Sequence, residues 1–192
     1  LVGSEMCIRD SFNTVSILWS QPITSLEVLM PDNIWRKVRH EPNAVVLNLG
    51  DAMHFISGGF FKPTIHRVVA PPEDQKHYNR LGVFYFAHFN ENVVLEPLLE
   101  SEIVKKASQG HDFWSERHSR GLPAVTAGEW ERMRVRAYGQ GGQKKGSDGH
   151  DHEKIAGVNV TLYNSIQNVP KVARKIGGVN EHARARVIHA TS

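Results

Sequence analysis

The chain has 192 residues, of which 40% are hydrophobic and 22% are charged, with a net charge of +3 and a single cysteine, Cys7. This length allows one modest domain with an extension, and the composition is typical of a soluble globular protein. No disulfide can form within the chain, and the longest apolar runs are too short to span a bilayer. Since the N-terminus lacks the basic and apolar regions of a secretory signal, we expect a cytoplasmic protein without a membrane partner.

The first eleven residues, LVGSEMCIRDS, differ in character from the sequence that follows. They resemble a translated sequencing-adapter fragment, and we interpret residues 1–11 as non-native. A genuine N-terminus is the alternative. On the first interpretation the native sequence resumes at Phe12, and Cys7 is not native.

Short apolar runs separated by turn residues fill the chain from residue 12 to residue 92. The runs that we interpret as strands are Thr14–Trp19, Leu26–Met30, Ile34–Val38, Ala44–Ser57, Thr64–Ala70 and Arg80–Phe89. The pair Gly50-Asp51 interrupts the fourth run and is interpreted as a turn between two strands. Because the gaps are too short for the helical crossovers that parallel strands need, the pattern predicts an all-β core.

The pattern becomes helical after Phe89. Residues 93–138 are predicted to form a helical extension, in which Thr126 and Glu129 have the spacing of a capping box that starts a helix near Ala127. Residues 139–192 are predicted to form a flexible, partly disordered tail, because their first part is rich in glycine and lacks periodicity. Within this tail, residues 155–164 fit either one more strand or an extended segment.

The tail is basic, with eleven Lys and Arg against five Asp and Glu between Glu131 and Ser192. A basic tail can contact nucleic acid. However, no aromatic residues alternate with the basic ones, as they do in proteins that bind single strands. We therefore interpret the tail as a solvated segment, and nucleic acid is not the expected partner. A basic-tailed interaction protein is kept as a minor alternative.

Several short blocks recur in a recognisable order between residues 12 and 92. They are Leu-x-Val, Trp-x-x-Val, Pro-x-Ala-x-x-x-Asn-x-Gly-Asp, Ser-Gly-Gly, His-Arg-Val, and an arginine that precedes the last apolar run. In this order the blocks resemble the C-terminal catalytic portion of the iron(II)/2-oxoglutarate-dependent oxygenases, in particular the isopenicillin N synthase-like branch. The resemblance implies a double-stranded β-helix (jelly roll), Fe(II), 2-oxoglutarate as cosubstrate, dioxygen and a small-molecule substrate.

Two residues match binding positions of that family. Enzymes of this kind hold Fe(II) with two histidines and one carboxylate, leaving open positions for the cosubstrate and dioxygen. By resemblance His66 is the distal histidine ligand. Arg80 matches the arginine that binds the far carboxylate of 2-oxoglutarate, a role that suits the planar two-donor fork of a guanidinium.

Three positions depart from the family pattern. The family carries His-x-Asp before its first matching strand, whereas this chain has Arg9 and Ser11 there, and Asp10 occupies the variable middle position. None of the 11 histidines has Asp or Glu two residues further on. Gly82 stands where the family commonly has a serine, which removes a hydrogen bond to a charged group worth about 1.5–3 kcal/mol unless another donor substitutes.

The sequence therefore predicts a fragment of a dioxygenase that oxidises a small organic molecule by hydroxylation, desaturation or ring closure, releasing succinate and carbon dioxide. Because only His66 remains of the expected iron ligands, we expect the chain as written to be inactive. The alternative is a non-catalytic jelly-roll domain that has lost its metal site. Fold alone does not decide between these two functions.

Overall fold

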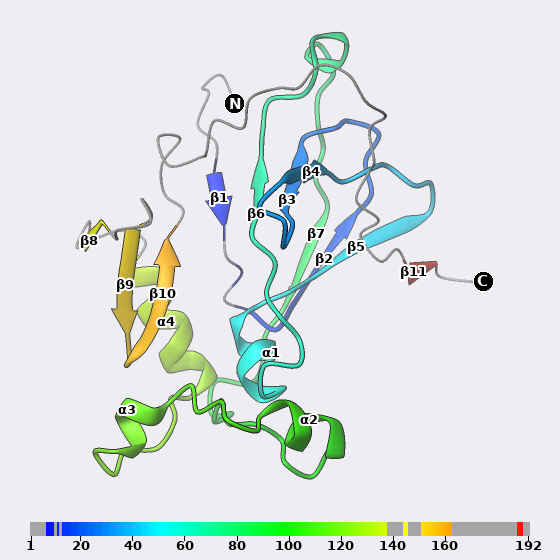
Figure 1. The fold of residues 1–192 in the computed structure, drawn as a ribbon. Coiled ribbons are helices and arrows are strands. Elements are labelled where there is room, and N and C mark those ends of the chain that lie inside the picture. Colours follow the sequence, from blue (N-terminus) through cyan, green and yellow to red (C-terminus); the bar gives the residue numbers. More distant parts are fainter. Residues whose placement is uncertain are drawn as a thin grey trace.

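A computed structural model describes residues 7–9, 11, 13–137, 144–145, 151–162 and 188–189. These residues form mostly antiparallel β-structure with short helices at one end of the sheets (Figure 1). No helix in the described ranges is long and apolar enough to cross a membrane. The predicted predominance of β-structure is confirmed, while the jelly roll stays a prediction.

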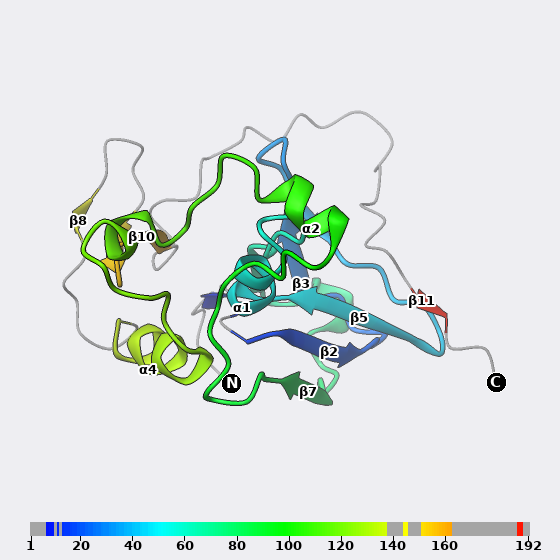
Figure 2. The same cartoon turned by 90° about the horizontal axis from the view of Figure 1, so that it is seen from below.

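Two four-stranded sheets form the larger part of this β-structure, beside a smaller three-stranded sheet, and all pairings in the two larger sheets are antiparallel. The first sheet contains, in spatial order, β1 (Cys7–Arg9), β6 (His66–Val68), β3 (Leu26–Leu29) and β4 (Trp35–Lys37). The second contains β11 (Ile188–His189), β5 (Ala44–Leu49), β2 (Val15–Trp19) and β7 (Phe84–Ala87). Figure 2 shows β5, β2 and β7 side by side.

The two sheets face each other across one pocket. Leu26 and Val38 line this pocket from the first sheet, and Leu18 and Val46 line it from the second. Side chains alternate between the two faces of a strand, so these four residues define the inner face of each sheet. We call the space between the two inner faces the inter-sheet pocket.

The inter-sheet space is open along β7 in the described part of the chain. Phe84 and Phe86 belong to the inner face because they pair with Leu18 and Ser16 of β2. Their rings stack with centroids 6.2 Å apart, yet they remain 50% and 52% exposed. A strand exposed on its face and at its edge is an aggregation hazard in water.

Residues 51–56 differ from the sequence prediction, because they form a helix, α1 (Asp51–Ile56), where a turn and a second strand were expected. The apolar residues Ala52, Phe55 and Ile56 have helical spacing and are all buried. A short apolar run of this kind cannot be told from a buried strand by hydrophobicity alone. Gly50 precedes the helix at a point where the backbone lies close to Ser11 and Asn13: a Cβ at Gly50 would lie 2.1 Å from the Asn13 carbonyl oxygen.

Two other strands are shorter than predicted. β6 contains only His66–Val68, and β7 begins at Phe84, so Arg80 lies in the segment before the strand instead of opening it. That segment follows a 3-10 turn, η1 (Glu73–Gln75). Leu81, Gly82 and Val83 therefore connect Arg80 to the sheet.

The predicted helical extension contains α2 (Glu102–Ala107), α3 (Ser115–His118) and α4 (Ala127–Ala137). The capping box is confirmed: the Thr126 backbone N–H donates to the Glu129 carboxylate at 2.8 Å, and the Glu129 N–H donates to the Thr126 hydroxyl at 3.3 Å. These two bonds satisfy backbone donors that a helix start leaves without intrahelical partners.

Most of the deeply buried apolar side chains lie beside α1 and not between the sheets. They form one cluster: Ala52, Phe55, Ile56, Leu95, Trp114, Ala124, Val125, Trp130, Ala137, Ile155 and Val160. Phe55 is at its centre, with ring centroids 4.8 Å from Trp114 and 4.9 Å from Trp130. α1 thereby joins the end of β5 to the extension (Figures 1 and 2).

An antiparallel hairpin occupies residues 151–162, which the sequence analysis placed in the flexible tail. It consists of β9 (Asp151–Ile155) and β10 (Val158–Leu162), with β8 (Lys144–Lys145) pairing beside β9. Ala156 and Gly157 both have positive φ, as a two-residue hairpin turn of this hand requires. The remaining tail predictions fall largely outside the described residues.

Candidate functional site

Arg80 lines the inter-sheet pocket together with the polar residues Ser20, Gln21, Arg39 and His40. None of the described residues that line it is acidic. The Nε atom of Arg80 is buried and has no hydrogen-bond partner among the described residues, and burial lowers the pKa of its guanidinium. A partly buried cation with an unused donor is a favourable place for a carboxylate, because the charge-assisted bonds offset the cost of desolvation.

Ser20 and His40 form a polar pair in the same pocket, which the sequence analysis did not single out. The Ser20 hydroxyl lies 2.8 Å from His40 Nδ1, and it accepts a hydrogen bond from the Glu41 backbone N–H at 3.1 Å. These residues meet only after folding, because they lie at the ends of strands from different sheets. No local motif in the sequence could have indicated the pair.

His66 is the first residue of β6. Its Nδ1 lies 2.9 Å from the Thr64 carbonyl oxygen, and a carbonyl only accepts, so Nδ1 carries the proton in this bond. In the neutral imidazole the unprotonated nitrogen is then Nε2. Metal-ligating histidines commonly have this arrangement, in which the second ring nitrogen donates to a backbone carbonyl.

The register of the first sheet places His66 on the inner face. Its Cα partner on β3 is Val28, two residues from the pocket-lining Leu26, and alternate residues of a strand share a face. His66 is not among the residues that line the inter-sheet pocket around Arg80. The structure therefore places both predicted site residues on the interior side of the sheets, but only Arg80 contributes to the pocket.

The positions expected to hold the other iron ligands lie close to this face. Arg9 is the Cα partner of His66 on β1. Ser11 accepts a hydrogen bond at 2.8 Å from Nδ2 of Asn48, a residue on the inner face of β5. Arginine and serine are not the ligands that Fe(II) takes in such sites.

Fe(II) therefore does not fit the described residues. They contain no group of three or more His, Cys, Asp or Glu side chains that could hold a metal ion. A single imidazole, with an arginine as its cross-strand partner, is too small a ligand set for this metal. The pocket around Arg80, in contrast, fits a carboxylate.

The outer face of the first sheet carries an ion pair that fixes the register of β6. The Arg67 guanidinium lies 2.6 Å from the Glu27 carboxylate and 4.0 Å from the centroid of the Trp35 ring. Glu27 and Arg67 are also Cα partners across β3 and β6. A one-residue slip would break this pair and turn His66 to the other face.

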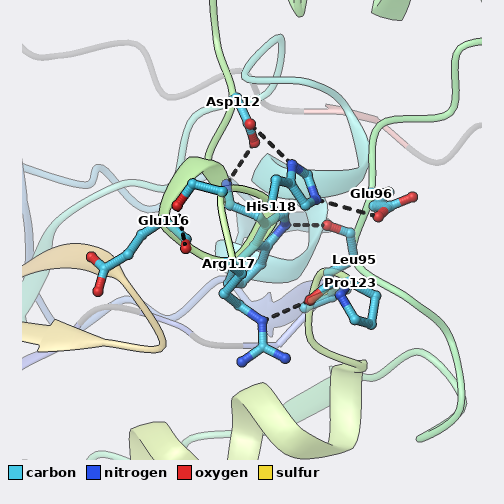
Figure 3. Close-up of polar contacts among 9 residues, drawn as sticks. Leu95, Glu96, Asp112, Glu116, Arg117, His118 and Pro123 are labelled. Carbon is cyan, nitrogen blue, oxygen red and sulfur yellow. Dashed lines mark hydrogen bonds and ion pairs between the residues drawn. The ribbon is translucent and has the colours of Figure 1, made fainter. Parts of the chain in front are cut away.

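A second polar cluster lies in the extension (Figure 3), and none of its residues lines the inter-sheet pocket. The His118 ring lies between two carboxylates, with Nδ1 2.9 Å from Asp112 and Nε2 3.7 Å from Glu96. Trp114 Nε1 donates to the Leu95 carbonyl at 2.7 Å. These contacts hold α3 against the segment at Leu95, and we assign the cluster a structural role.

Comparisons with known proteins agree with this geometry. The sequence model described as the 2OG-Fe(II) oxygenase superfamily matches residues 5–89. The chain is 33% identical over 84 residues to jasmonate-induced oxygenase 3 of Arabidopsis thaliana, which covers 44% of this chain and 22% of that protein. It is 32% identical over 111 residues to the 2-oxoglutarate-dependent dioxygenase frbH of Dothideomycetidae sp. (strain 11243), covering 56% of this chain and 34% of that protein.

A solved structure shares the fold. The crystal structure of a full-length Neurospora crassa protein in complex with alpha-KG superimposes with a TM-score of 0.57 at 20% identity, covering 71% of this chain and 38% of that chain. Residues 5–89 thus resemble the 2OG-Fe(II) oxygenase superfamily, whose cofactor and cosubstrate are Fe(II) and 2-oxoglutarate. The predicted resemblance to this superfamily is confirmed, and the chain spans about a third or less of the length of the two curated relatives above.

Proposed function

We propose that this chain is the C-terminal portion of an Fe(II)- and 2-oxoglutarate-dependent dioxygenase that oxidises a small organic molecule. In the whole enzyme, hydroxylation, desaturation or ring closure of that molecule accompanies the conversion of 2-oxoglutarate and dioxygen to succinate and carbon dioxide. Residues 12–92 supply the jelly-roll portion, residues 93–138 the helical extension, and residues 139–192 the basic tail. Residues 1–11 are proposed to be non-native.

The observation that carries this proposal is the environment of Arg80. In the described part of the chain, its guanidinium lines a pocket without acidic residues, and its buried Nε has no hydrogen-bond partner. One carboxylate of 2-oxoglutarate would supply the missing acceptor and the missing negative charge. The apolar inner-face residues around it would strengthen that attraction by excluding water.

His66 is proposed as the one iron ligand that this chain contributes. Its Nδ1–H donates to the Thr64 carbonyl, which fixes the ring and leaves Nε2 as the nitrogen with a lone pair in the neutral form. The Glu27–Arg67 pair on the opposite face holds the strand in the register that keeps His66 on the inner face.

A second candidate function is a domain that binds the cosubstrate without catalysis. It is favoured by one observation, namely that the Cα partner of His66 is Arg9, where the family has a histidine. Both candidates predict binding of 2-oxoglutarate. They differ in iron-dependent turnover, which only the first allows once the ligand set is complete.

The Arg80 site predicts that the chain binds 2-oxoglutarate in the absence of metal, and that Arg80→Ala weakens binding about tenfold to a hundredfold. That range corresponds to the roughly 1.5–3 kcal/mol of hydrogen bonds to a charged group, at about 1.4 kcal/mol for each factor of ten. Arg80→Lys should retain part of the affinity, because it keeps the charge but loses the two-donor fork. Isothermal titration calorimetry measures the dissociation constants.

The matched control is Arg132→Ala. Arg132 is paired with Glu91 at 3.3 Å in the extension and does not line the pocket, so its removal makes the same change in net charge elsewhere. Its affinity for 2-oxoglutarate should equal that of the unmodified chain. Equal binding by the Arg80→Ala variant would remove the basis for the proposed function.

A further inference from the structure

Ser20 lies directly across the sheet from Gly82. The register of β2 and β7 pairs Leu18 with Phe84, and the Trp19 N–H donates to the Val83 carbonyl at 3.2 Å, which continues the ladder by one step. The next pair in this register is Ser20 and Gly82. On its other side the Ser20 N–H donates to the Ala44 carbonyl at 3.1 Å, so Ser20 still lies in the plane of the sheet.

Residues opposite each other in antiparallel strands project their side chains to the same face, with Cβ atoms about 4.5–5.5 Å apart. Gly82 has no side chain, so Ser20 alone supplies a side chain at this pair. Both Ser20 and Arg80 line the inter-sheet pocket. Arg80 lies two residues before Gly82, and alternate residues of an extended segment share a face.

The hydroxyl of Ser20 is free to donate elsewhere when His40 Nδ1 carries a proton. Its oxygen already accepts from the Glu41 N–H and lies 2.8 Å from His40 Nδ1. When Nδ1 carries a proton, the oxygen accepts twice and both lone pairs are used. The hydroxyl proton of Ser20 is then available for another acceptor. An anion bound at Arg80 would favour the chain in which His40 donates to Ser20 and Ser20 donates to the anion, because hydrogen bonds in a chain polarise one another.

We propose that Ser20, oriented by His40, donates the hydroxyl hydrogen bond to the carboxylate held by Arg80. This inference rests on the proposed function, because it names a further binding residue for the same cosubstrate. It also accounts for Gly82, the position where a serine was expected from the family pattern. A Cβ at Gly82 would lie 2.3 Å from Cε2 of Phe84, so a side chain there requires that ring to move.

The test compares binding of 2-oxoglutarate, without metal, to the unmodified chain and to its variants. Ser20→Ala removes the hydroxyl and should weaken binding about tenfold, the effect of one hydrogen bond to a charged group. Ser20→Thr keeps the hydroxyl and should bind within about threefold of the unmodified chain, which separates loss of the donor from a general disturbance of the strand. Thermal unfolding of each variant establishes that it is folded.

Ser119→Ala provides the matched control, since this serine hydroxyl lies in the extension, outside the pocket, and donates to the Glu116 carbonyl. Its affinity should not change. If Arg80→Ala weakens binding but folded Ser20→Ala binds like the unmodified chain, the role of Ser20 is wrong and the proposed function stands. If the unmodified chain does not bind 2-oxoglutarate at all, both are wrong.

Discussion

Replacing Arg134 by methionine is expected to lower the free energy of unfolding by about 3–5 kcal/mol, the usual cost of breaking a buried ion pair by removing one partner. The Arg134 side chain is 0% exposed, and its Nε lies 3.2 Å from the carboxylate of Asp51 at the start of α1. Methionine would leave the Asp51 carboxylate buried without its cation. Chemical denaturation at pH 7 measures the loss.

The destabilisation caused by Arg134→Met should depend on pH, and it should be smaller at low pH than at pH 7. Burial raises the pKa of Asp51 above its ordinary value of 3.8, and the charge of Arg134 opposes this rise. A carboxyl group whose pKa is raised by folding contributes most to stability when the pH is below its pKa in the unfolded chain. That contribution is lost as the pH rises through its pKa in the folded chain. Without Arg134 the pKa rises further, so the destabilisation measured at pH 7 should shrink toward pH 4.

Arg132→Met is the control on the same helix. Arg132 lies 3.3 Å from Glu91, but both side chains are more than half exposed. An exposed pair of this kind contributes about 0–1 kcal/mol. Equal losses for Arg132→Met and Arg134→Met, or a loss at Arg134 that does not change with pH, would contradict the assignment of a buried ion pair.

Completing the ligand set should produce the largest functional change. The chain as written is expected to show no iron-dependent release of succinate from 2-oxoglutarate. Arg9→His together with Ser11→Asp, on an N-terminally extended chain, should restore Fe(II) binding and turnover. Arg9 is the Cα partner of His66, and the Ser11 side chain reaches Asn48 on the inner face, so the substituted groups start on the correct face.

The controls for this experiment are a displaced His-x-Asp motif and substitutions of His66 and Arg80 in the repaired chain. Ile8→His alone creates His-x-Asp with Asp10, but one residue out of register, because Ile8 is the Cα partner of Arg67 and not of His66. It should not bind iron. In the repaired chain, His66→Ala should abolish turnover through loss of the metal, and Arg80→Ala through loss of the cosubstrate. Succinate release by the unrepaired chain, or full activity of repaired His66→Ala, would show that the metal site is misidentified.

The strands were predictable because their period of two is a local property of the sequence. β2, β3 and β4 each lie within a predicted run, and the capping box located α4 from two residues alone. The helix α1 was not predictable, because its apolar residues follow β5 directly and the combined run has no boundary that hydrophobicity can mark. Only burial against the extension decides its conformation.

The candidate site residues could be chosen from residue identity, whereas contacts that depend on strand register could not be predicted, and the roles of His66 and Arg80 stay predictions. His66 and Arg80 were selected because their blocks match a family, and both lie on the interior side of the sheets. Ser20 and His40 come together through the pairing of strands from two sheets. The Asp51–Arg134 pair likewise joins segments far apart in the chain, so neither residue could be assigned a partner in advance.

The match to the superfamily model and the packed core end at different places in this molecule. The model match ends at residue 89, yet Leu95, Trp114, Val125 and Trp130 surround Phe55 of α1 further along the chain. A polypeptide trimmed to its recognisable part would keep the pocket residues but expose the aromatic side of α1, which follows directly from β5. The end of the superfamily-model match is therefore not a boundary at which the molecule can be divided.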